Sequence, residues 1–372
     1  MPTPALMLDR AILEHNISAM AAKARRLGVH LRPHVKTHKC LEVARLQRDA
    51  GAAGITVATM VEARDFAADG WDDITWAFPL VPSRLGEVVD LARRITLRVL
   101  VDSEVAAERL AAAAREAGLT IHVWLEVDCG YHRSGVDPAA EASVALARWL
   151  DTAEGLAFDG ILTHAGHAYH ARDRAELVRI AAQERDAMVG FAGRLRAAGV
   201  RVPSVSIGST PSMAAHEVLT GIDEVRPGNY AFYDYMQVSA GVCRPEDVAV
   251  SVLASVVSHQ PGAGQVIVDA GALAMSKDLG HGDAYGPGRG LGPLYQGLTG
   301  AALDPTASLV NVSQEHGFVA GPRPSDVEGR FPVGAPVRIM PNHSCLTAAL
   351  FDEYHVVEGG AVTQHWKILR GR

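Results

Sequence analysis

The sequence predicts an α/β protein in which a (β/α)8 barrel of the TIM type is followed by a mostly β domain. Up to about Tyr230, short apolar strands alternate with Ala-, Arg- and Glu-rich segments whose apolar residues recur at helical spacing. After about Gly241, β-branched strands separated by Gly/Pro turns replace that alternation. We therefore expect the barrel in residues 1–240 and the mostly β domain in residues 241–372.

Eight strands, each followed by a helical segment, are expected in the first part, and this number favours a closed barrel. Helical segments such as Ser103–Gly118 and Ala171–Gly199 lie between strands. A capping box over Thr59–Glu62 and the pair Asp137-Pro138 predict two helix starts. The candidate strands are His30–Lys36, Gly54–Thr59, Asp73–Phe78, Leu97–Asp102, Ile121–Asp128, Phe158–His164, Ser204–Gly208 and Glu224–Tyr230.

The second part is expected to contain strands with few helices. Residues 1–9 are a candidate for one further strand of this domain. The Gly/Pro-rich run Gly280–Gly292 is typical of a mobile loop, and its residues assign it no role. The candidate strands are Val248–Ser258, Gln265–Asp269, Leu309–Ser313, Pro336–Met340 and Tyr354–Val357.

Composition narrows the class of protein. The chain has 372 residues, of which 48% are hydrophobic, so it can bury a sizeable core. Its net charge of −7 and the absence of a basic stripe argue against a nucleic-acid partner. No signal peptide and no stretch long enough to span a membrane are visible, and the four cysteines form no CxxC pair. We expect a cytoplasmic protein with reduced thiols that does not contact a membrane.

The segment from Leu31 to Lys39 concentrates an arginine, two histidines and two lysines at the end of the first predicted strand. In an extended segment, Lys36 and His34 point to the same face. A lysine that projects into a closed site can lose its proton and form a Schiff base. The alternative is a solvated basic strand edge, and the remaining strand ends argue against it.

Polar residues follow most of the predicted barrel strands, at the end where barrel enzymes place their chemistry. Ser209-Thr210-Pro211 predicts a capped short helix over Met213–Leu219, whose first N–H groups would bind an anion. Gly208, Gly228 and Asn229 would allow close approach and supply amides. An ordinary helix cap is the alternative. A phosphate bound at this helix start and an aldehyde bound to Lys36 together describe pyridoxal phosphate.

Two arginines and a tyrosine are further candidates for cofactor contacts. Arg133 could donate to the phenolate oxygen of the cofactor, and Arg226 could face its ring nitrogen and keep that nitrogen unprotonated. Tyr169 could stack on the ring or donate a hydrogen bond. The alternatives are salt bridges at the barrel end for the arginines and rim packing for the tyrosine.

His343 and Cys345 form the second chemical cluster. An imidazole and a thiolate separated by one residue can reach the same cation, and this ligand pair suits Zn²⁺. Two protein ligands leave coordination positions open for a substrate hydroxyl. The alternative is a buried cysteine beside a partly buried histidine.

Four motifs resemble the D-threonine aldolase/D-serine dehydratase family of fold-type III pyridoxal-phosphate enzymes, which are related to alanine racemase. The resemblance covers essentially the whole chain. It implies that Lys36 binds pyridoxal phosphate, and that His343 and Cys345 hold a divalent metal such as zinc, manganese or magnesium. It also implies a homodimer and the cofactor contacts Tyr169, Thr210, Gly228, Asn229 and, more weakly, His164. The motifs are Arg32–Thr37, His132–Val136, Gly208–Pro211 and Pro341–Cys345.

The resemblance favours a D-3-hydroxy-amino-acid aldolase, which would release glycine and an aldehyde. His167 and His170 are candidate bases for the β-hydroxyl, as is a hydroxide on the metal. Dehydration of D-serine or a 3-hydroxyaspartate to a 2-oxo acid and ammonia is the main alternative. A non-catalytic pyridoxal-phosphate carrier and an amino-acid racemase are more distant ones, because the carriers lack a β domain and a racemase needs no metal.

Overall fold

The structure is a computed structural model and describes residues 1–279, 290–327 and 329–371. Within these residues, eight parallel strands form one sheet in the order β2-β9-β8-β7-β6-β5-β4-β3. A parallel bridge between His34 and Thr56 joins its two ends, so the sheet closes into a barrel. The strands are β2 (His30–Leu31), β3 (Ile55–Val57), β4 (Asp73–Pro79), β5 (Thr96–Val101), β6 (Ile121–Glu126), β7 (Leu156–Leu162), β8 (Ser204–Ile207) and β9 (Glu224–Val225).

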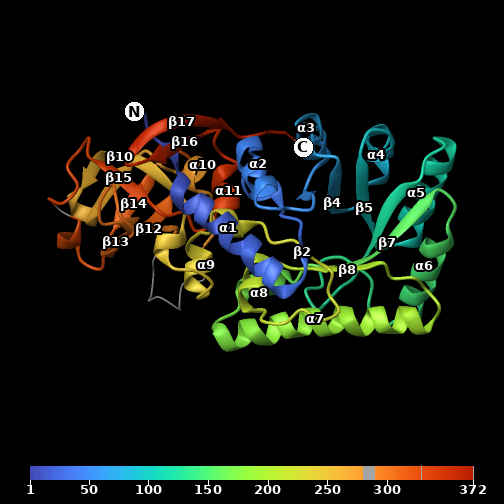
Figure 1. Cartoon of the computed structure of the whole chain (residues 1–372). Helices are drawn as coiled ribbons and strands as arrows, with labels where there is room; N and C mark the ends of the chain where they lie inside the picture. Colours follow the sequence, from blue (N-terminus) through green and yellow to red (C-terminus); the bar gives the residue numbers. More distant parts are fainter. Residues whose placement is uncertain (280–289, 328, 372) are drawn as a thin grey trace.

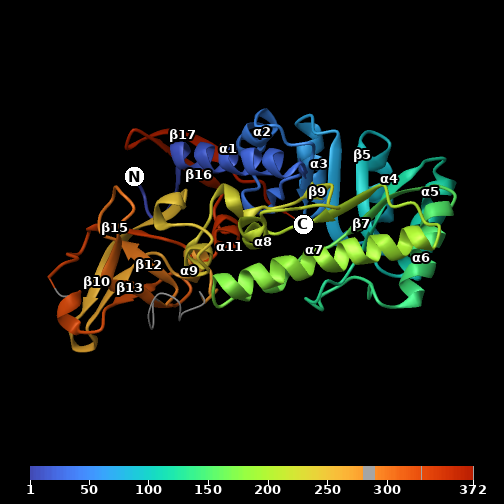
Figure 2. The same cartoon turned by 60° about the horizontal axis from the view of Figure 1, so that its bottom comes forward.

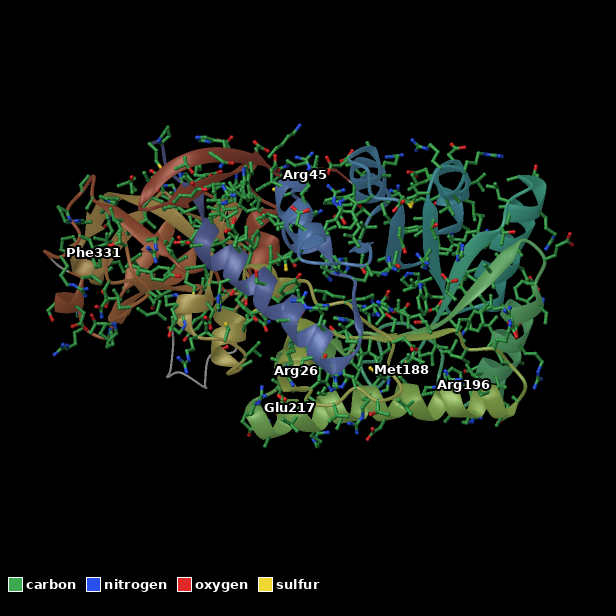
Figure 3. All side chains as sticks on the ribbon, viewed as in Figure 1. Arg26, Arg45, Met188, Arg196, Glu217 and Phe331 are labelled. Atoms are coloured by element: carbon green, nitrogen blue, oxygen red, sulfur yellow. The ribbon has the colours of Figure 1, made fainter. Side chains whose placement is uncertain are left out.

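Helices surround the barrel, and the longest of them, α7 (Arg174–Ala197), runs along one side of it (Figure 1). Figure 2 shows α1 (Arg10–Leu27) and α7 on neighbouring sides of the barrel. An ion pair of 3.5 Å joins Arg26 at the end of α1 to Glu217, and the two labelled side chains lie side by side in Figure 3. The other helices around the barrel are α2 (Leu41–Asp49), α3 (Met60–Ala68), α4 (Leu85–Ala92), α5 (Glu104–Glu116), α6 (Glu141–Thr152) and α8 (Thr210–Ala215).

The second sheet has nine strands in the described residues, in the order β11-β14-β13-β12-β15-β10-β1-β16-β17. Strand β1 (Ala5–Asp9) lies between β10 and β16, so the first residues of the chain pair with its last third. The other strands are β10 (Val250–Gln260), β11 (Gln265–Val268), β12 (Gly292–Tyr295), β13 (Leu303–Val312), β14 (Gly317–Ala320), β15 (Pro336–Ile339), β16 (Glu353–Glu358) and β17 (Ala361–Lys367). The helices α9 (Tyr235–Ser239), α10 (Ala272–Met275) and α11 (Ser344–Ala348) complete this part.

Several predicted boundaries were wrong. The strand predicted over His30–Lys36 ends at Leu31, because Pro33 has no N–H and the ring of His34 accepts from the Lys36 amide at 3.4 Å, turning the chain into the 3-10 helix Val35–Thr37. Helix α6 starts at Glu141 rather than at Pro138, since the Asp137 carboxylate accepts from the Ala139 amide and forms a local turn.

Strands β12, β14 and β17 were not predicted, because β12 and β14 have only four residues and the sequence of β17 is mostly polar. Most of the Gly/Pro-rich run, residues 280–289, lies outside the described residues. No helix among the described residues is long and apolar enough to cross a membrane.

Candidate active site

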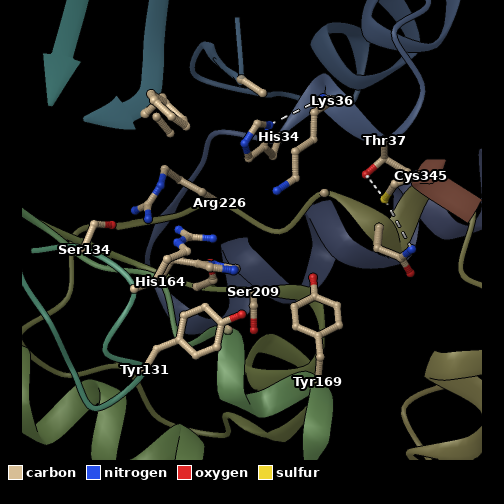
Figure 4. A pocket seen from close by; sticks show the side chains of 18 of the residues that line it. His34, Lys36, Thr37, Tyr131, Ser134, His164, Tyr169, Ser209, Arg226 and Cys345 are labelled. Atoms are coloured by element: carbon tan, nitrogen blue, oxygen red, sulfur yellow. Dashed lines mark hydrogen bonds between the residues drawn. The ribbon is translucent and has the colours of Figure 1, made fainter. Parts of the chain in front are cut away.

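A cavity of about 570 Å³ opens at the carboxyl ends of the barrel strands, where the second sheet's α11 meets the barrel (Figure 4). Most of the residues predicted for the site line it, although they come from many separate segments of the chain. They are Lys36, Arg133, His164, Tyr169, His170, Ser209, Arg226, Gly228, Asn229, His343 and Cys345.

Lys36 lies on the 3-10 turn that follows β2, not on the strand itself, and its amine points into the cavity (Figure 4). Burial lowers the pKa of this amine, and the nearby Arg133 lowers it further, while Cys345 partly opposes the shift. A lowered pKa favours the neutral amine, which is the form that attacks a carbonyl.

The other basic residues of the opening segment have structural roles. Arg32 pairs with Glu224 at 2.5 Å and with Asp73 at 2.6 Å inside the barrel. His38 is buried against Gln47, and burial lowers its pKa to about 3. Among the basic residues of this segment, Lys36 and His34 line the cavity, whereas Arg32 and His38 do not.

The predicted anion pocket lies at the start of α8. Ser209 caps this helix, and its hydroxyl accepts from the Ser212 amide at 3.3 Å. The helix begins at Thr210, three residues earlier than predicted, because Pro211 fits the first turn. Thr210 does not line the cavity; its hydroxyl accepts from the Tyr230 amide at 3.0 Å and also contacts the Tyr169 hydroxyl.

Gly228 and Asn229 bring the segment after β9 against Lys36's turn. A Cβ on Gly228 would lie 2.7 Å from the His34 carbonyl oxygen, so only glycine fits at this approach. The Asn229 side chain donates to Asp234 at 2.7 Å and to Ser344 at 2.9 Å, while its buried oxygen has no partner in the described residues.

Arg226 lines the cavity from the interior of the barrel. Its guanidinium donates to the Ser206 hydroxyl and to the Thr163 carbonyl, both neutral acceptors. Burial lowers its pKa to about 10, and Glu224 partly opposes the shift. Next to it, burial and the charge of Lys36 lower the pKa of His164 to about 3, so this imidazole is neutral.

His343 and Cys345 lie at the start of α11 and reach the cavity from the second sheet's side. His343 Nδ1 lies 2.5 Å from an Asp278 carboxylate oxygen, and the Cys345 thiol donates to the Thr37 hydroxyl at 3.3 Å. Although burial alone lowers the pKa of His343, Cys345 raises it, to about 10. Burial raises the pKa of the Cys345 thiol, but the interaction with His343 outweighs burial and lowers this pKa. Since Thr37 follows Lys36, the amine and the imidazole–thiol pair share one cavity.

Arg133 and the two candidate bases differ in position. Arg133 is exposed at the cavity rim, with its guanidinium 5.4 Å from the centre of the Tyr131 ring. His170 lines the cavity and is exposed. His167 stacks on the Tyr131 ring at 6.1 Å and does not line the cavity, which argues against its predicted role as a base.

Comparison with known proteins agrees with this geometry. Residues 8–236 match the family model "Alanine racemase, N-terminal domain", and residues 249–357 match "Putative serine dehydratase domain". The chain is 42% identical to the D-threo-3-hydroxyaspartate dehydratase of Delftia sp. (strain HT23), over 99% of this chain and 97% of that one. It is 32% identical to the D-threonine aldolase of Arthrobacter sp., over 98% and 92%.

Two solved structures of mutants of a D-threo-3-hydroxyaspartate dehydratase superpose with a TM-score of 0.95 each at 40% identity. One is a cysteine-to-alanine mutant in the metal-free form, and the other is a histidine-to-alanine mutant. Each superposition spans 100% of this chain, together with 98% of the cysteine mutant and 96% of the histidine mutant.

The chain belongs to the D-threonine aldolase/D-serine dehydratase family. It is a fold-type III enzyme with an alanine racemase-type barrel, and it is a lyase whose cofactors are pyridoxal phosphate and a divalent metal ion. The expected fold class is thereby confirmed.

The cavity fits both cofactors. For pyridoxal phosphate it offers a buried amine on Lys36, a helix start at Ser209, and the glycine at 228 whose Cβ would be blocked. For a metal ion it offers a soft thiol and an imidazole that already interact with each other, with the Asp278 carboxylate beside them.

Two supporting residues were not assigned a role from the sequence. Asp278 follows Ser276 and Lys277 in a polar stretch of the sequence, but its contact with His343 spans 65 positions. Glu184 is fully buried on α7 and accepts from the Gly208 amide at 3.0 Å and from the Ala165 amide at 3.2 Å. An acidic residue on the apolar face of a long helix was the only available signal for Glu184.

Proposed function

We propose that the protein is a pyridoxal-phosphate- and metal-dependent dehydratase that converts a D-3-hydroxy amino acid, D-threo-3-hydroxyaspartate first among them, to a 2-oxo acid and ammonia. The observation that carries the proposal is the common cavity of Lys36, His343 and Cys345. The 42% identity with a D-threo-3-hydroxyaspartate dehydratase over almost the whole of both chains supports this substrate.

When bound, pyridoxal phosphate supplies an electron sink for a bond at Cα, and the metal ion supplies a Lewis acid for the β-hydroxyl. Lys36 would bind the cofactor and then, as a free amine, take the proton from Cα. Its lowered pKa suits this role, because the amine must be neutral to accept a proton. Ser209, Gly228 and Asn229, which line the cavity, would hold the phosphate. Thr210, which does not line it, would position Tyr169 and the Tyr230 amide beside them.

Arg226 and Arg133 would orient the ring of the cofactor from two sides. The Arg226 guanidinium is fixed by two neutral acceptors, so it can face the ring nitrogen without giving up a proton. Arg133 would donate to the phenolate oxygen, and neutral His164 would pack near the ring. His343 and Cys345 would hold the metal ion, as the metal-free cysteine mutant of the relative supports.

The choice between dehydration and aldol cleavage depends on which proton is removed. Elimination of water needs one base at Cα and a Lewis acid at the β-oxygen, which Lys36 and the His343–Cys345 pair would provide. Aldol cleavage instead needs a base at the β-hydroxyl. Of the two histidines predicted for that role, only the exposed His170 lines the cavity. The cavity therefore leaves a base for either reaction, and dehydration is favoured by the 42% identity with a D-threo-3-hydroxyaspartate dehydratase, against 32% with a D-threonine aldolase.

A D-3-hydroxy-amino-acid aldolase is the second candidate, because the chain is also 32% identical to a D-threonine aldolase over most of its length. The homodimer implied by the resemblance remains a prediction of this proposal.

The test is a product assay with D-threo-3-hydroxyaspartate, D-serine and D-threonine. We expect a 2-oxo acid and ammonia, and no glycine. Cys345→Ala and His343→Ala should keep the cofactor's absorbance but lose the metal ion of the cavity and turnover. Cys243→Ala, which removes a thiol outside the cavity lining, is the control and should retain both. Glycine with an aldehyde as the main products would replace the proposal with the aldolase, and full turnover in EDTA would remove the metal from it.

A further inference from the structure

Three potential metal ligands gather on the outer face of the hairpin formed by β16 and β17, away from the cavity. His355 on β16 lies directly opposite His365 on β17, and their ring centroids are 4.7 Å apart. Glu353 lies two residues before His355, so its side chain points to the same face of the strand. None of the three lines the cavity described above.

The packing of the hairpin fixes which face these side chains occupy. Tyr354 and Trp366, which alternate with them along the two strands, are 0% and 6% exposed and belong to the hydrophobic core. Because side chains alternate along a strand, burial of this pair holds Glu353, His355 and His365 on the opposite face. The strands are seen at the top of Figure 1, with β17 at the edge of the nine-stranded sheet.

The distances are close to those of a coordination sphere. Each residue offers one ligand atom, and these atoms all lie within 4.8 Å of one another. Glu353 Oε1 lies 3.1 Å from His365 Nδ1 and 3.8 Å from His355 Nε2. In a tetrahedral zinc site the metal–ligand bonds are about 2.1 Å, so ligand atoms lie roughly 3.4 Å apart. Small side-chain rotations would bring all three atoms to that separation.

His355 supplies an independent sign that a ligand is missing. Its side chain is only 15% exposed, and the buried Nδ1 has no hydrogen-bond partner in the described part of the chain, while Nε2 faces Glu353. A shielded polar group without a partner is costly unless a ligand satisfies it.

We propose that Glu353, His355 and His365 form a second metal site, which binds a first-row divalent cation such as Zn²⁺ on the β16–β17 hairpin. Two imidazoles and a carboxylate are a ligand set that Zn²⁺ accepts, with a remaining position for water. The ion links the edge strand β17 to β16, whose other neighbour is the N-terminal strand β1. Its role is structural: it holds the edge of the sheet and leaves the chemistry of the cavity unchanged.

The experiment counts Zn²⁺ per chain in the holoenzyme after equilibrium dialysis. The variants are His365→Ala and Glu353→Gln, with His15→Ala on α1 as a control that removes another exposed histidine. We expect each of the first two to lose one ion, or to bind it more than about tenfold more weakly, and to keep wild-type turnover. His15→Ala should match the wild type.

Adding the same changes to Cys345→Ala separates this site from the cavity. Cys345→Ala alone should still bind one Zn²⁺ and gain thermal stability from it, and the added His365→Ala should abolish both effects. Equal Zn²⁺ content and equal affinity with and without His365 in this background would overturn the proposal, whatever the reaction at the cavity proves to be.

Discussion

The two ends of the barrel differ in whether their charged side chains have partners of opposite charge. At the end where the strands begin, Arg32 pairs with Glu224 and Asp73, while Arg98 pairs with Asp73 and, at 2.7 Å, with Asp159. The Ser206 hydroxyl donates to the remaining oxygen of Glu224 at 2.7 Å. Each buried charge at this end therefore has a partner of opposite sign, as stability requires.

At the cavity end, two cations lack such a partner. Arg133 and Arg226 form no ion pair with a carboxylate in the part of the chain that the structure describes, and Arg226 donates to neutral oxygens instead. Cations left without carboxylates favour an anionic ligand, which here would be the cofactor and its substrate. One end of the barrel is therefore organised for stability and the other for binding.

The largest effect should follow from Lys36→Ala at the cavity. Turnover is expected to fall by about 10⁴-fold or more, because the variant lacks the group that we propose binds the cofactor and moves the α-proton. The free energy of unfolding of the apoprotein should not decrease, since burial disfavours the charged amine. Steady-state assays and denaturant unfolding measure the two quantities. A variant that keeps turnover and the cofactor's absorbance would place the reactive amine elsewhere.

Arg32→Met should have the largest effect on stability. The change leaves Glu224 and Asp73 without their shared cation, and we expect a loss of about 3–5 kcal/mol in the free energy of unfolding. Arg133→Met at the cavity rim is the matched control, and it should change stability by less than about 0.5 kcal/mol. Similar losses from the two variants in urea titrations would remove the distinction between the two ends.

Gly228→Ala tests how closely two segments approach at the cavity. The added Cβ would lie 2.7 Å from the His34 carbonyl oxygen, so we expect a cost of about 1–3 kcal/mol and weaker cofactor binding. Gly190→Ala on α7 is the control, because a Cβ there meets nothing within 4 Å and a helical glycine is replaced by a better helix former. It should stabilise the protein slightly. Cofactor titration with unfolding measurements would show whether the two glycines differ.

The smallest effect should be on the pH dependence of stability, through Glu184 on α7, whose carboxylate accepts from backbone amides at the cavity end. Burial raises the pKa of this carboxyl, but His216, Ser212 and the Gly208 amide outweigh burial, so its pKa is lowered. Its stabilising contribution is therefore present above the unfolded value of about 4.3 and is lost as the pH falls through the folded value. Below about pH 4.3, the stability of the wild type should fall more steeply than that of Glu184→Gln. Parallel pH profiles would show that Glu184 is not the group responsible.

The sequence by itself determined the order of barrel strands, the residues at their ends and the cofactors. Local spacing was enough to select Lys36, the helix start at Ser209-Thr210-Pro211 and the pair His343 and Cys345 as candidates, because the residues of each motif lie within a few positions of one another. Local spacing cannot separate Arg32 and His38, which are buried in the barrel, from Lys36 and His34, because it does not show their partners.

Only the tertiary structure decided which of these groups meet. The contact between Thr37 and Cys345 joins positions 308 residues apart, and the exclusion of His167 from the cavity depends on how Tyr131 packs beside it. The pairing of His355 with His365 likewise follows from the register of two strands. A sequence fixes periodicity along one element, whereas distances between elements result from packing the whole chain into one core.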